Sequence, residues 1–183
     1  KASAKAAELI DMNKHQGEHP RIGATDVIPF TPLAEATMAE CVDLARDLGQ
    51  EIAEKLGIPV YLYEQASTRP HLTTLPQIRA GQYEGLKEAI KTPERWPDFG
   101  PHETHPTAGA TAVGAREFLI AFNVNLDTAD VTIAKSIAKA IRESSGGYKN
   151  VKALGIMIEE RNLAQVTINM CNYRTTPLHR VFE

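Results

Sequence analysis

The segment His15-Gln-Gly-Glu-His-Pro-Arg21 and the nearby Asp26 concentrate groups that can transfer protons or bind charged ligands. Within twelve residues they provide two imidazoles, two carboxylates and a guanidinium, in a turn that also contains Gly17 and Pro20. A histidine, whose free pKa is about 6.5, suits proton transfer in both directions at neutral pH. Such a density of titratable groups at the end of a predicted helix indicates a candidate acid–base site.

Two other interpretations of this segment fit its spacing. The first is a solvated helix end, because His15 and His19 would lie near the carbonyl end of the helix dipole, which favours cations. The second is a metal site, because residues four apart share a helix face. However, Gly17 lies between the two histidines, and no His-Glu-x-x-His pattern is present. Spacing alone leaves catalysis, a surface turn and a metal site open.

A second segment, residues 107–115, consists of small side chains. Small residues let a ligand approach the backbone, and the N–H groups of such a loop can hold anions or carbonyl oxygens. Gly109 and Gly114 are spaced as in a phosphate loop, but Ala115-Arg116 replaces the Lys-Ser/Thr pair that such a loop requires. The segment is therefore either a ligand-binding loop or a tight helical turn packed against a sheet.

The elements that position these segments follow from hydrophobic periodicity and from helix and turn signals. Helices are predicted over residues 2–14, 37–57 and 130–141, with shorter helical patches at 75–80 and 82–91. Strands are predicted over residues 58–63, 117–126, 151–159 and 163–173; the last two form a hairpin. Residues 27–33 contain two prolines and form an edge strand or a loop, whereas 117–126 is apolar enough to be buried on both faces.

The order strand–helix–strand occurs twice, with a hairpin appended. This order predicts a single domain, residues 1–183, of the α/β (α+β) class. We expect a two-layer, ferredoxin-like sandwich in which helices pack on a mixed, largely antiparallel sheet.

Composition excludes several classes of protein. The chain has 183 residues, of which 43% are hydrophobic and 23% charged, which is an ordinary globular balance. The net charge of −3 provides no basic field for nucleic acid, and no apolar run reaches the roughly 18 residues that a membrane span needs. The two isolated cysteines, Cys41 and Cys171, form neither a disulfide framework nor a Cys-x-x-Cys metal site. These features indicate a reducing, cytoplasmic location.

Several stretches, in order along the chain, match one family. They are Leu9-Ile-Asp-Met, His15-Gln-Gly-Glu-His-Pro-Arg21, Asp26-Val-Ile-Pro-Phe, Pro59-Val-Tyr-Leu-Tyr, Arg79-Ala-Gly-Gln-Tyr-Glu, Pro97-Asp-Phe-Gly-Pro, Gly109-Ala-Thr-Ala-Val-Gly-Ala-Arg116, Phe118-Leu-Ile-Ala-Phe-Asn-Val-Asn-Leu and Leu163-Ala-Gln-Val. Together they resemble the N-terminal subdomain of the glutamate formiminotransferase family, which is also found fused as formiminotransferase-cyclodeaminase.

The resemblance implies a reaction and the residues that perform it. A formimino group would pass from N-formiminoglutamate to N5 of the co-substrate tetrahydrofolate, without a metal, in histidine degradation and one-carbon metabolism. His19, the histidine of the Gly-Glu-His-Pro motif, would be the general acid and base. From proximity in sequence we expect Asp26 or Glu18 to orient it and Arg21 to bind a carboxylate. The folate-contacting loop of the family corresponds to Gly100, Pro101, His102, Glu103, Thr104, His105, Pro106, Thr107, Ala108 and Gly109.

The resemblance also implies a cytoplasmic homodimer that binds polyglutamyl tetrahydrofolate, no nucleic acid and no membrane. The family's first strand, with its Val-Pro-Asn-Phe-Ser-Glu-Gly motif, and its second subdomain are expected to be missing from this chain. Since the family's active site is a cleft between two subdomains, the chain is expected to hold half of it. Two alternatives are a non-catalytic subdomain that binds folate or a partner, and a metal-dependent amidine hydrolase using His15, His19 and Asp26.

Overall fold

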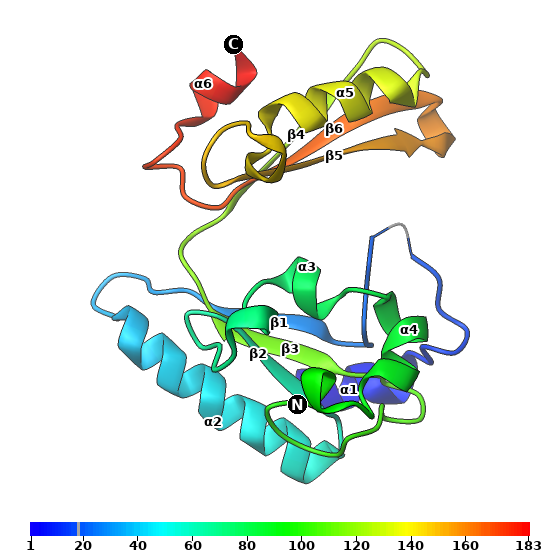
Figure 1. Ribbon diagram of the computed structural model, residues 1–183, viewed down its shortest axis with the longest axis vertical. Helices are drawn as coiled ribbons and strands as arrows, with labels where there is room; N and C mark the ends of the chain where they lie inside the picture. The colour runs from blue at the N-terminus through cyan, green and yellow to red at the C-terminus, as the bar shows by residue number, and fades with distance from the viewer. Residues whose placement is uncertain (18) are drawn as a thin grey trace. The chain divides into compact units, whose positions relative to one another are not determined.

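The chain divides into two compact units in the computed structural model, which describes residues 1–17 and 19–183. The first unit is Lys1–Arg116 and the second is Glu117–Glu183 (Figure 1). The predicted class, a mixed α/β fold with helices packed on sheets, is confirmed. The sequence predicted one domain with one mixed sheet. The structure differs, because each unit has its own three-stranded sheet and its own hydrophobic core.

The first unit is built on a parallel sheet with the strand order β1-β3-β2. Its strands are β1 (Asp26–Phe30), β2 (Val60–Glu64) and β3 (Thr111–Ala115). The long helix α2 (Met38–Leu56) covers one face, and α3 (Leu75–Ile78) and α4 (Gln82–Ala89) cover the other (Figure 1). The unit also contains α1 (Ala2–Leu9) and the 3-10 helices Pro70–Leu72 and Pro93–Arg95.

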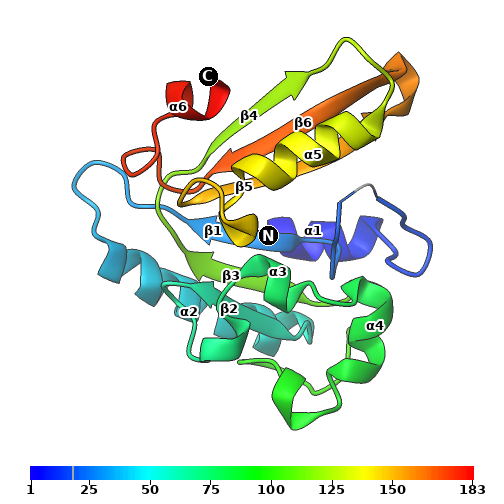
Figure 2. The same ribbon diagram turned by 45° about the horizontal axis from the view of Figure 1, so that its top comes forward.

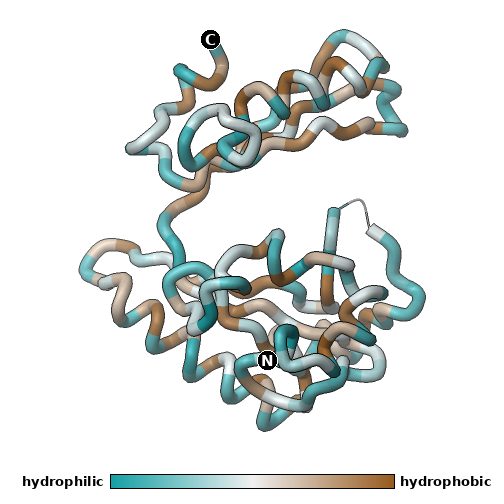
Figure 3. The backbone as a smooth tube through the Cα atoms, in the orientation of Figure 1, coloured by the Kyte–Doolittle hydropathy of each residue, from teal (hydrophilic) through white to brown (hydrophobic). Residues whose placement is uncertain are grey.

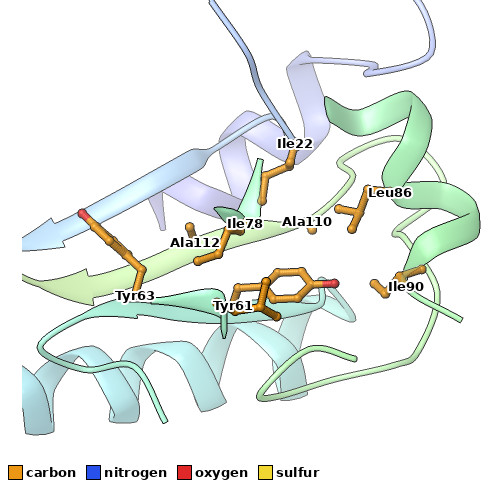
Figure 4. Packing of buried hydrophobic residues seen from close by; sticks show 9 residues of the cluster. Ile22, Tyr61, Tyr63, Ile78, Leu86, Ile90, Ala110 and Ala112 are labelled. Carbon is orange, nitrogen blue, oxygen red and sulfur yellow. The ribbon is translucent and has the colours of Figure 1, made fainter. Parts of the chain in front are cut away.

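Strand β3 corrects the prediction for the small-residue segment. Residues 111–115 form neither a ligand-binding loop nor a helical turn, but the buried middle strand of the parallel sheet. Their small size serves packing: the rings of Tyr61 and Tyr63 lie over this strand, beside Ala112 (Figure 4). A Cβ atom on Gly114 would lie 2.4 Å from Cδ1 of Tyr63. Three of the five residues of β3 are alanine or glycine, which are depleted in strands, so the sequence of this segment does not stand out as a strand.

The helix signals of the first unit are confirmed at α2. Thr37 and Glu40 form a capping box at its start, and Gly57 ends it with a φ of 64°, the left-handed conformation that glycine adopts readily. The two-proline segment forms β1, an edge strand, where Pro29 can lack an N–H group because one side of the strand is unpaired.

The second unit is an antiparallel sheet with the order β4-β6-β5. Its strands are β4 (Ile120–Asn125), β5 (Val151–Ile158) and β6 (Leu163–Met170). Helix α5 (Val131–Ile141) lies along one face of the sheet (Figure 2), and hydrophobic residues recur along the helix and the strands (Figure 3). The remaining elements are the 3-10 helices Glu143–Ser145 and Glu159–Arg161 and the terminal helix α6 (Leu178–Phe182).

The predicted hairpin is confirmed, since β5 and β6 pair antiparallel. Every second residue of β6 from Ala164 onward is buried. The prediction that β4 is buried on both faces is wrong. Its residues are half-buried or exposed because it is the edge strand of a sheet that α5 covers on one face. Neither Cys41 nor Cys171 forms a disulfide; Cys41 is buried and Cys171 is half-buried. Across the described residues, no helix is both long and apolar enough to cross a bilayer.

Candidate active site

The predicted acid–base segment lies between α1 and β1, and its described residues, 15–17 and 19–21, form no helix or strand. His19 is exposed, which leaves its imidazole accessible to a substrate. Within the described part of the chain, no group forms a hydrogen bond with this ring. Glu18, one of the two carboxylates expected to orient it, lies outside the residues that the structure describes.

Asp26, the other expected orienting group, lies at the start of β1 with a φ of 60°, a conformation that few residues other than glycine adopt. Its Oδ1 accepts a hydrogen bond of 2.8 Å from the backbone N–H of Ile22, and its Oδ2 forms an ion pair with Arg79. The side chains of Asp26 and Arg79 are 22% and 24% exposed. One carboxylate oxygen of Asp26 therefore binds the backbone of the first unit and the other binds Arg79. A direct bond from Asp26 to His19 stays a prediction.

Arg21, expected to bind a carboxylate of the substrate, binds a carboxylate of the protein in this structure. Its Nη1 and Nη2 donate to Oε2 and Oε1 of Glu84 at 2.9 and 2.6 Å, a bidentate pair. Nη1 also donates to the side chain of Gln82 at 3.1 Å, and Nη2 to the carbonyl of His15 at 2.9 Å. The hydrogen bonds between Arg21 and Glu84 lower the pKa of Glu84 to about 2 and raise the pKa of Arg21, so both groups are charged at physiological pH.

The structure brings the second predicted segment beside the first. The N–H of Met12 donates to the carbonyl of Thr107 at 2.7 Å. The N–H of Ala24 donates to Ala108, and the N–H of Ala110 to Ile22, both at 2.9 Å. Ile22 points into the hydrophobic core, which fixes this junction to the body of the unit (Figure 4).

Gly109 is required at the junction for two reasons. Its φ is 71°, and a Cβ atom there would lie 2.3 Å from the carbonyl oxygen of Ile22. Its N–H also bonds the carbonyl of His105 at 3.2 Å, and its own carbonyl accepts from the N–H of His105 at 2.9 Å. The close backbone approach that this glycine permits is therefore to the His19 segment.

Two histidines of the predicted folate-contacting loop have defined partners. Nδ1 of His105 accepts hydrogen bonds from the N–H groups of Thr107 at 3.3 Å and Ala108 at 3.0 Å. Nδ1 of His105 thus holds the backbone of the two residues that follow Pro106. The ring of His102 stacks on Trp96 with centroids 4.2 Å apart and planes 14° from parallel. Among the described residues, no group of three or more His, Cys, Asp and Glu side chains could hold a metal ion.

Several residues that support the two segments carry no signal in the sequence. Asn13 donates from Nδ2 to the carbonyl of Pro106 at 2.8 Å. Its Oδ1 accepts from the hydroxyl of Tyr83 at 2.9 Å and from Nζ of Lys87 at 2.8 Å. Tyr83 and Lys87 belong to α4, about seventy positions from Asn13, so no local spacing could reveal the contact.

Comparison with known proteins identifies a family for the chain. Residues 1–116 match the family described as formiminotransferase domain, N-terminal subdomain, and residues 121–183 match the formiminotransferase domain. The chain belongs to the formiminotransferase domain family. The two matches divide the chain at nearly the same place as its two compact units. The second unit therefore corresponds to part of a formiminotransferase domain beyond the N-terminal subdomain.

Two glutamate formimidoyltransferases and one formimidoyltransferase-cyclodeaminase are similar to this protein over almost its whole chain. The glutamate formimidoyltransferase of Streptococcus pyogenes serotype M1 is 52% identical over 178 residues, 97% of this chain and 60% of that protein. That of Thermoplasma acidophilum is 54% identical over 97% of this chain and 59% of that protein. The formimidoyltransferase-cyclodeaminase of Mus musculus is 50% identical over 100% of this chain and 35% of that protein. The chain thus spans about three fifths of the single-function relatives.

Proposed function

We propose that the protein transfers a formimino group from N-formiminoglutamate to N5 of tetrahydrofolate, with His19 as the general acid and base. The observation that carries the proposal is the identity of 52% to 54%, over 97% of the chain, with proteins named glutamate formimidoyltransferase. It is supported by the exposed His19 in a segment whose two ends are fixed to the first unit. The reaction belongs to histidine degradation and one-carbon metabolism.

The chemistry needs one group that can both accept and donate a proton. N5 of the folate attacks the formimino carbon and gives up its proton to the neutral imidazole of His19. The tetrahedral adduct then breaks its bond to the glutamate nitrogen, which takes the proton back from the imidazolium. Glutamate leaves and His19 is again neutral. Holding the two substrates together provides much of the remaining acceleration.

The supporting roles are proposals of the same kind. Residues 100–109 would contact the folate, and their backbone bonds to residues 12–24 would place that contact near His19. We further propose a cytoplasmic homodimer that accepts polyglutamyl folate. Light scattering of the purified protein tests the dimer, and a monomer at micromolar concentration would contradict it.

The proposal is tested by an assay with formiminoglutamate and tetrahydrofolate, using the wild-type protein, His19→Ala and the control His179→Ala. His179 is exposed on α6 and belongs to neither predicted segment, so its loss should leave turnover within about twofold. His19→Ala should lower kcat by about 10²–10⁴-fold, the usual contribution of general acid–base catalysis. Wild-type turnover in His19→Ala would remove His19 from this role. Folate binding without any product in the wild type would favour a non-catalytic binding subdomain.

A further inference from the structure

We propose that Arg21 is a positioning residue: through Glu84 on α4 it holds the segment that carries His19 in one conformation. For its catalytic consequence the inference rests on the proposed function. For its structural content it rests only on the contacts of the first unit. It replaces the expectation that Arg21 binds a carboxylate of the substrate.

The guanidinium closes the segment on itself. Nη2 donates to the carbonyl of His15, six residues earlier in the chain, at 2.9 Å. Residues 15–21 thereby form a loop whose ends are joined by a charge-assisted hydrogen bond, with His19 inside it. Residues 15–17 and 19–21 form no helix or strand, so this bond takes the place of the backbone hydrogen bonds that such an element would provide.

Helix α4 provides the anchor, since three consecutive residues contact Arg21. Gln82 and Glu84 accept from the guanidinium, and the N–H of Tyr83 donates to the backbone carbonyl of Arg21 at 2.9 Å. The side chain of Arg21 is 11% exposed. The attachment therefore uses both the side chain and the backbone of the residue two positions after His19.

The anchor is itself fixed to the core. Tyr83 and Leu86 are buried, and the hydroxyl of Tyr83 bonds Asn13 at 2.9 Å. Asn13 continues the connection to the carbonyl of Pro106. Helix α4, which is held on the core by Tyr83 and Leu86, thus sets the position of Arg21. A site supported in this way restricts a reactive group to a smaller range of positions than an unsupported loop does.

The contacts leave Arg21 little capacity for a ligand. Its four terminal N–H groups correspond to four bonds, two to Glu84 and one each to Gln82 and His15. Its Nε is buried and has no partner among the described residues. A substrate carboxylate could bind bidentately only by displacing Glu84. Lysine could not replace this arginine, because one ammonium cannot form the fork to Glu84 and reach His15 at the same time.

The test combines amide exchange with kinetics in Glu84→Gln, Arg21→Lys, the double variant and the control Glu88→Gln. Glu88 lies on the same helix and pairs with Lys91 at the surface, away from Arg21. In Glu84→Gln we expect exchange at the amides of Tyr83 and Ile22 to rise about tenfold, and the ¹⁵N heteronuclear NOE of Gly17 and His19 to fall. Glu88→Gln should leave both within twofold of wild type.

The kinetic result separates positioning from substrate binding. Loss of positioning should lower kcat about tenfold with KM changed less than twofold, whereas loss of a substrate contact should raise KM. The double variant should be no worse than either single one, because both remove the same connection. Unchanged amide exchange in Glu84→Gln and Arg21→Lys overturns the proposal, as does an increased KM with normal kcat. If the wild type shows no formimino transfer, the proposed function fails, while the exchange data still decide whether Arg21 holds the segment.

Discussion

The pair formed by Asp26 and Arg79 offers the sharpest test of how the first unit holds its candidate site. Asp26→Asn keeps the size of the side chain and keeps Oδ1 as acceptor for the N–H of Ile22. It also tolerates the φ of 60°, since asparagine is enriched in that region. The change removes the negative charge and places an amide N–H₂ opposite the guanidinium, which also donates only. Arg79 is left without its ion-pair partner.

The magnitude follows from the burial of the pair. Breaking a fully buried pair costs about 3–5 kcal/mol, and an exposed pair about 0–1 kcal/mol. The side chains of Asp26 and Arg79 are 22% and 24% exposed, so we expect an intermediate loss of about 2 kcal/mol in the free energy of unfolding. For a unit of this size that corresponds to a decrease in Tm of roughly 8 °C.

The assay is urea unfolding of the variant beside the wild type and the control Asp43→Asn. Asp43 is exposed on α2, and its substitution should change stability by less than about 0.5 kcal/mol. Adding Arg79→Gln to Asp26→Asn should restore part of the loss, because it removes the unpaired charge. A loss below about 0.5 kcal/mol in Asp26→Asn, or strict additivity in the double variant, would refute the argument.

Two further predictions concern the same unit. The pKa of Glu84, lowered from 4.5 to about 2 by Arg21, makes its stabilising contribution full above pH 4.5 and lost as the pH falls toward 2. Glu84 is 63% exposed, so its contribution to the free energy of unfolding is at most about 1 kcal/mol. The difference in this free energy between the wild type and Glu84→Gln should therefore shrink between pH 6 and pH 2.5. A difference that stays constant with pH would contradict the pairing of Glu84 with Arg21. Gly114→Ala should destabilise by about 2–3 kcal/mol in chemical unfolding, because the new Cβ would meet Tyr63 at 2.4 Å. Gly85→Ala, whose Cβ meets nothing within 4 Å, should stabilise α4 by about 0.5–1 kcal/mol, and equal effects of the two substitutions would contradict the packing.

Local signals predicted the elements that depend on few neighbours. The helix between Thr37 and Gly57 and the hairpin of β5 and β6 depend on short stretches of sequence, and both are confirmed. The same local reading failed at β3, since small residues such as Ala112 and Gly114 carry no strand signal by themselves. They form a strand because β3 lies between β1 and β2, where only small side chains leave room for the rings of Tyr61 and Tyr63.

The candidate site shows the same division. The chain by itself determined that titratable groups gather between His15 and Asp26, that the small-residue segment is built for close approach, and that the motifs belong to one family. Only the tertiary structure decided that Arg21 binds Glu84 and that Asp26 binds Arg79. These pairs join positions more than fifty residues apart. The sequence alone is equally compatible with an ion pair between either arginine and any other exposed carboxylate. The packing of α3 and α4 on the parallel sheet selects the partners, because it places one particular carboxylate or guanidinium within hydrogen-bond distance of each.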